Sequence, residues 1–265
     1  MKRMPAFLRH LLLLLMLTSL LSAGQQASYP YNPDVSQEVW QQLEPYFLPY
    51  DHPVKKKLDR LFSKKRATAT LESFRKAGFL NAKFREPTNI VVGLNSELKG
   101  FVIKAYLDSQ PPLCEWENWL KRIRGAERVR NCIQAHHFKD CLVPHKWIYP
   151  LPREPKGAKS AARKHFILVV EEMPILKAQD NLKAFNQKMT KRLLTQLYTV
   201  IQECGLIDSV YPDNIPFTRE GQIAFIDTEH SGLSPIPFHV LSSFLSPNMQ
   251  TTLQNLINTG YTAGR

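Results

Sequence analysis

The segment GLIDSVYPDNIPFTREGQIAFIDTEH, residues 205–230, reads as a loop, a polar turn and a short apolar strand that ends in an acidic residue. An Asp-Asn pair stands just before the turn, and Asp-Thr-Glu closes the strand. Oxygen-bearing side chains at both ends of such a hairpin raise the question of a functional site. The residues around which a site would form are Asp208, Asp213, Asn214, Asp227 and Glu229.

Residues 1–24 have the layout of a secretory signal peptide. Basic residues precede an apolar run at 11–21, and the small residues SAG follow it. The apolar run is shorter than the about 20 residues that span a bilayer. We therefore predict a cleaved leader, a mature chain that begins near Gln25 and a secreted or extracytoplasmic protein. An uncleaved N-terminal anchor is the alternative.

The chain is basic, with a formal net charge of +12, and removal of the three basic residues of the leader leaves +9. The basic residues cluster at 54–66, 120–130 and 153–165. Such clusters suit phosphate-bearing partners or an anionic lipid surface, although solvated helix and loop faces are the simpler interpretation. Aromatic residues do not alternate with the basic ones and no nucleic-acid motif occurs, so we expect no nucleic acid as partner.

The chain has four cysteines, namely Cys114, Cys132, Cys141 and Cys204. A secreted location permits disulfides, and four cysteines allow three pairings that the sequence does not rank. Cys132 and Cys141 are close enough in the sequence to close a local loop. The alternative is a zinc cluster of Cys132, His136, His137, Cys141 and His145. Because this spacing matches no zinc-finger or zinc-knuckle pattern, we favour disulfides or buried thiols.

Residues 34–80 are predicted to be helical. DVSQEVWQQLEPYF offers Asp34 or Ser36 as its N-terminal cap, and TATLESFRKAGF ends at Gly78, where a helix C-terminus favours a left-handed residue. Nothing in this part of the chain carries recognisable chemistry. We therefore interpret residues 25–88 as an accessory helical extension.

From residue 89 the hydrophobic pattern changes to that of β-structure. NIVVGLNSELKGFVIKAYLD, residues 89–108, predicts a hairpin with a turn at 95–100 and with Lys104 inside the second apolar run. The elements expected after it are a helix at 111–133, strands at 141–152 and 165–176, a long helix at 186–205 and a last helix framed by Ser246-Pro247 and Gly260.

The order of these elements resembles the protein-kinase-like fold. The resemblance rests on VIKAY around Lys104, VVEEM at 169–173, Asn214 in PDNIPF and Asp227 in IAFIDTE. It implies an α+β fold of two lobes, with an antiparallel N-lobe sheet and a small helical C-lobe. The implied division is a helical N-terminal extension at 25–88, an N-lobe at 89–173 and a reduced C-lobe at 174–265.

In that family a strand lysine holds the α- and β-phosphates of ATP and pairs with a helix glutamate. A catalytic-loop asparagine and an aspartate after the next strand hold Mg²⁺. The resemblance therefore implies ATP with Mg²⁺ or Mn²⁺ as cofactors. It assigns Lys104 to the phosphates, Glu127 (or Glu117) to the lysine, Glu172 and Met173 to adenine, Asn214 and Asp227 to the metal, and Asp208 to the general base.

The chain also departs from the family pattern. No glycine-rich loop precedes the hairpin, and the position five residues before Asn214, where the family has its base, is Ser209. Only 38 residues follow Asp227, too few for the usual activation segment and peptide-binding helices. We expect a secreted kinase-like phosphotransferase with an unknown acceptor. The alternatives are an inactive pseudokinase-like interaction module and a secreted basic protein that binds anionic lipid or polymer.

Overall fold

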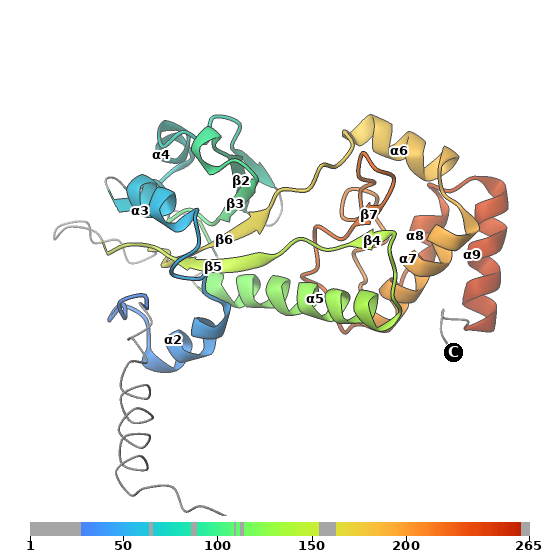
Figure 1. The fold of residues 1–265 in the computed structure, drawn as a ribbon, viewed down its shortest axis with the longest axis horizontal. Coiled ribbons are helices and arrows are strands. Elements are labelled where there is room, and N and C mark those ends of the chain that lie inside the picture. The colour runs from blue at the N-terminus through green and yellow to red at the C-terminus, as the bar shows by residue number, and fades with distance from the viewer. Residues whose placement is uncertain are drawn as a thin grey trace, which may run out of the picture.

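The computed structural model describes residues 28–63, 66–85, 89–108, 110–111, 114–153 and 163–260. The predicted leader lies outside these residues, as does most of the basic stretch at 153–165. The described chain is α+β, with an antiparallel sheet next to a helical part (Figure 1). No helix in the described ranges is long and apolar enough to cross a membrane.

The main sheet has five strands, and all neighbours in it are antiparallel. Across the sheet the strands are β1 (Lys83–Arg85), β2 (Ile90–Leu94), β3 (Phe101–Ala105), β6 (Phe166–Glu171) and β5 (Lys146–Pro150). The predicted hairpin is confirmed as β2 and β3, joined by a turn that contains the short 3-10 helix η2 (Ser96–Leu98). Lys104 lies in β3 opposite Val92 on one side and Leu168 on the other.

Both faces of the sheet are covered, so β6 is almost entirely apolar and buried. One face packs against α3 (Lys55–Ser63) and α4 (Leu71–Lys76), which lie above the sheet in Figure 1. The other face packs against α2 (Gln37–Leu43) and α5 (Glu115–Ala135), below the sheet in the same view. Alternate residues of each strand serve the two faces, as the period of two along a strand requires.

The N-terminal segment therefore belongs to the core of the sheet part, although the sequence suggested an accessory role. Leu58 and Phe62 of α3 and Phe74 of α4 are buried in one cluster with sheet residues, and β1 extends the sheet at its edge. Ser36 caps α2, as one of the two expected candidates, and Gly78 has a φ of 97° just after α4. Helices α3 and α4 thus form a structural layer that covers one face of the sheet.

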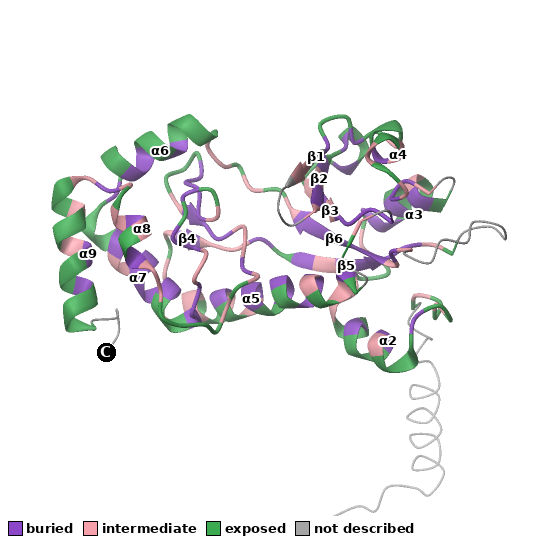
Figure 2. Cartoon of the chain, turned by 180° about the vertical axis from the view of Figure 1, so that it is seen from behind, coloured by how far each residue is buried: buried purple, intermediate pink, exposed green. Residues whose placement is uncertain are grey.

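The helical part has its own buried apolar cluster, built mainly by α6 (Ala178–Gln187), α7 (Lys191–Cys204), α8 (Phe238–Ser242) and α9 (Pro247–Thr259). The outer faces of α6 and α9 are exposed, as Figure 2 shows. Two short parallel strands, β4 (Cys141–Leu142) and β7 (Ile223–Ala224), join this part. The framing of the last helix is confirmed, with Ser246 before α9 and Gly260 left-handed after it.

Two predicted elements are wrong in their bounds. The long helix expected at 186–205 begins only at Lys191, as α7, because α6 ends at Gln187 and the Thr190 hydroxyl caps α7 by accepting a hydrogen bond of 3.2 Å from Leu193 N. The strand expected at 141–152 is likewise divided into β4 and β5, which pair in different sheets.

Replacement of a core leucine tests whether the N-terminal helices carry stability. Leu58 is 0% exposed, so we expect Leu58→Ala to lower the free energy of unfolding by about 2–5 kcal/mol through lost burial and a cavity. Leu80→Ala is the matched control, since Leu80 is 76% exposed and its loss should change stability by at most ~0.5 kcal/mol. Chemical denaturation measures both. Equal stability of the two variants would restore the accessory interpretation.

Candidate functional site

The centre of the candidate site is the contact between α5 and residues 227–229. Arg122 of α5 is buried, with 3% of its side chain exposed, and its guanidinium donates hydrogen bonds to Asp227 Oδ1 and Glu229 Oε2. Two acids that follow β7 are thereby tied to a helix about one hundred residues earlier in the chain. A buried arginine of this kind requires such partners, since an unpaired buried charge is very unfavourable.

A glycine in α5 permits this close approach. Gly125 lies one turn after Arg122, and a Cβ atom built on it would lie 1.8 Å from the carbonyl oxygen of Thr228. The hydroxyl of Thr228 donates a hydrogen bond of 2.8 Å to the Arg122 carbonyl and accepts one of 2.8 Å from Lys146 Nζ. Helix α5, strand β5 and the segment after β7 therefore meet at Thr228.

Three basic side chains surround this junction, namely Lys104 of β3, Arg122 of α5 and Lys146 of β5. Lys146 is buried, and burial together with the neighbouring charge of Lys104 holds the pKa of its amine well below the usual range. The positive charge of this partly water-excluded region therefore comes mainly from Lys104 and Arg122.

Asp227 remains ionised in these surroundings. Burial alone would raise the pKa of its carboxyl, but the charges of Lys104 and Arg122 and the hydrogen bond from Arg122 outweigh burial. They hold that pKa well below its usual range. The side chain is still 30% exposed, so a ligand can reach it.

The loop before β7 is hydrogen-bonded to the backbone at Ile226 and Asp227. The side-chain amide of Asn214 donates to the Asp208 carbonyl at 2.9 Å, and Ile226 N donates to the Asn214 carbonyl at 3.0 Å. Ser209 Oγ donates to the Asp227 carbonyl at 3.4 Å. The residues at the two ends of the 205–230 segment are therefore brought together, as its sequence suggested.

Asp208 and Asp213 lie away from the centre of the site. Asp208 lies at its edge, where its Oδ2 is 3.3 Å from Nε2 of His230 and 43% of its side chain is exposed. Asp213 is exposed on the loop. The role of Asp208 as a base stays a prediction.

The pairing of Lys104 with Glu127 or Glu117 of α5 stays a prediction. Glu127 lines a small hollow with Arg130, His145 and Lys146. Glu117 is exposed on the first turn of α5. Arg122 is the α5 side chain that bonds to Asp227 and Glu229, so the helix contributes a positive charge at this point.

The segment after β6, with Glu172 and Met173 that the resemblance assigns to adenine, leads to the helical part and forms a short connector. Glu172 N donates to the Gly100 carbonyl at 2.8 Å, and Met173 is half-buried, with its carbonyl accepting from Ile175 N at 2.8 Å. These bonds fix the backbone between the two parts of the molecule. Adenine binding by Glu172 and Met173 stays a prediction.

The cysteines are free thiols. The thiol beside Cys132 is that of Cys204 at the end of α7, whereas Cys141 is buried in the helical core with Sγ 4.0 Å from Gln196 Oε1. The local Cys132–Cys141 loop is therefore not formed, because β4 carries Cys141 away from the end of α5.

Sequence reasoning missed Arg122, Gly125, Lys146 and Thr228 as site residues. One signal was available, since an isolated glycine in a helical pattern often marks a close packing contact. The two basic residues gave no signal, because basic residues are frequent in this part of the chain. The sequence matches no protein-family model and has no significant match among curated proteins.

Substitution of Gly125 tests the helix contact. We expect Gly125→Ala to lower the free energy of unfolding by about 1–3 kcal/mol, because its methyl group collides with the Thr228 carbonyl. Helix propensity alone would raise the free energy of unfolding by about 1 kcal/mol, because alanine favours a helix more than glycine does. A decrease in the free energy of unfolding would therefore identify the contact. Urea denaturation is the measurement, with Lys121→Ala at an exposed position of α5 as control. A stabilised Gly125→Ala variant would contradict the packing.

The lowered pKa of Asp227 predicts a pH dependence of stability. Its ionised form is favoured in the folded state, so the contribution is fully present above the unfolded pKa of about 3.9 and is lost as pH falls through the lower folded pKa. The difference in free energy of unfolding between wild type and Asp227→Asn should be constant near neutral pH and shrink below about pH 4. Asp213→Asn, at an exposed aspartate, is the control; a difference independent of pH would refute the ion pairing.

Proposed function

We propose that this chain has a protein-kinase-like fold and binds ATP between its five-stranded sheet and its helical part. The observation that carries the proposal is the convergence of Lys104, Asn214 and Asp227, on which the resemblance rests. Lys104 acts electrostatically on Asp227, and Asn214 is bonded to the backbone beside it. An antiparallel sheet joined by a short connector to a helical part is also what the resemblance implies.

The charges of the site favour a polyphosphate ligand. Lys104 and Arg122 supply positive charge beside Asp227, which suits the several negative charges of ATP. The side-chain Nδ2 of Asn214 donates a hydrogen bond to the Asp208 carbonyl, which leaves Oδ1 of Asn214 as the ligand atom. Asp227 similarly retains Oδ2, since Oδ1 accepts from Arg122. Carboxylate and amide oxygens are ligand types that Mg²⁺ and Mn²⁺ take, and such an ion would neutralise phosphate charge, whereas the nearby cations disfavour a bare metal ion.

Phosphoryl transfer is the activity proposed first, because it depends mainly on positioning and charge. Lys104 would orient the phosphates, and Asn214 and Asp227 would fix the cation. Asp208, exposed beside His230 at the rim, would orient the acceptor hydroxyl. The acceptor itself is a hydroxyl compound or protein of unknown identity.

An inactive, pseudokinase-like function is the second candidate. Two observations favour it: Arg122 already engages Asp227, and the family's base position is the buried Ser209, whose hydroxyl is bonded to a backbone carbonyl. Such a protein would bind nucleotide without transferring phosphate and act through a protein partner. Binding to an anionic lipid or polymer stays a prediction from the charge of the chain.

Thermal denaturation with ATP, alone and with Mg²⁺ or Mn²⁺, tests the proposal on the chain from residue 25. We expect a higher melting temperature with ATP and metal together, since a ligand at 100 times its Kd stabilises by ~2.7 kcal/mol. Lys104→Ala should weaken binding at least tenfold, whereas Lys99→Ala, at an exposed lysine, should not. The proposal fails if no nucleotide changes the melting temperature. Release of ADP in the same samples separates the active from the inactive candidate.

A further inference from the structure

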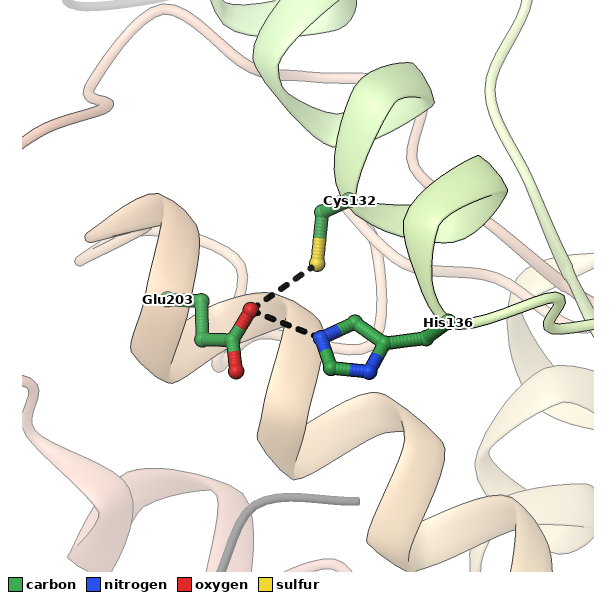
Figure 3. Close-up of side chains that lie close together, drawn as sticks. All are labelled: Cys132, His136 and Glu203. Carbon is green, nitrogen blue, oxygen red and sulfur yellow. Dashed lines mark hydrogen bonds and ion pairs between the residues drawn. The ribbon is translucent and has the colours of Figure 1, made fainter. Parts of the chain in front are cut away.

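A second cluster of ligand-type side chains lies far from the nucleotide site, where the C-terminal ends of α5 and α7 meet (Figure 3). Cys132 and His136 are four residues apart on the last turn of α5 and its cap, so they share one helix face. Glu203 comes from the last turn of α7 and points between them. This set replaces the cluster suggested by the sequence, since His145 stacks on Trp147 and does not join it.

The three ligand atoms are already close together. Glu203 Oε2 lies 2.8 Å from His136 Nε2 and 3.7 Å from Cys132 Sγ, and all three atoms lie within 4.8 Å of one another. In a tetrahedral zinc site with bonds of about 2.0–2.3 Å, ligand atoms are roughly 3.2–3.8 Å apart. Small side-chain rotations would therefore suffice to enclose an ion.

We propose that Cys132, His136 and Glu203 bind a zinc ion that links the C-terminal ends of α5 and α7. Thiolate, imidazole and carboxylate are the ligands that zinc takes in proteins. The location also favours a cation, because the negative ends of two helix dipoles meet here. Glu203 is 30% exposed along its side chain, which gives the ion a path of entry.

Cys204 is the nearest candidate for the fourth ligand. Its thiol interacts with that of Cys132 and donates to the Arg128 carbonyl at 3.6 Å. The same proximity makes a Cys132–Cys204 disulfide the rival outcome.

Metal titration of the reduced, metal-free chain tests the site. We expect one Zn²⁺ per chain and a higher melting temperature, and one Co²⁺ with a thiolate-to-metal absorption band. Loss of a residue that only hydrogen-bonds to a metal ligand weakens metal binding roughly 10–100-fold. Cys132→Ser and His136→Ala each remove a ligand itself, so each should weaken zinc binding by more than this. Cys114→Ser, at an exposed cysteine outside the cluster, should bind as wild type does.

Two results would overturn the zinc site. One is the absence of binding by a reduced chain whose circular dichroism is native, or binding that survives in Cys132→Ser. The other is a chain purified without reductant that holds no zinc and has two thiols fewer than the four of the sequence, because Cys132 would then be joined to Cys204. Glu203→Gln keeps the size of the side chain and checks that any loss of binding reflects the ligand rather than the fold.

Discussion

The close contact between α5 and residues 227–229 is the constraint on which the rest of the structure depends. Gly125 lets the helix backbone reach the Thr228 carbonyl, and Arg122 then bonds both flanking acids. The same helix packs against β5 and β6 of the sheet and against α7 and β4 of the helical part. A helix of 21 residues, about 31 Å long, thereby fixes how the two parts of the chain face each other.

The contact also explains the electrostatics of the site. Burying Arg122 among Asp227 and Glu229 is tolerable only because the charges pair, and Lys104 adds further positive charge nearby. The same helix ends at Cys132 and His136, so the proposed nucleotide site and the proposed zinc site would share one rigid element.

Local patterns in the sequence were sufficient for several elements. The alternating apolar residues and the turn at 95–100 specified the β2–β3 hairpin, and Gly205 and Gly260 marked helix ends through their left-handed backbone. The break between α6 and α7 was missed because it contains neither glycine nor proline. The role of the N-terminal helices was missed because an amphipathic face does not say which surface it will cover.

The sequence by itself determined the α+β class and the closeness of Asp208, Asn214 and Asp227, since a short hairpin brings its two ends together. Only the tertiary structure decided which α5 residue would face them. Arg122 and Glu127 are five residues apart, which turns their side chains about 140° from each other around the helix axis. The docking of Gly125 on Thr228 sets the rotation of α5 and so directs Arg122 to Asp227, and a contact between residues one hundred positions apart leaves no local pattern from which that rotation could be predicted.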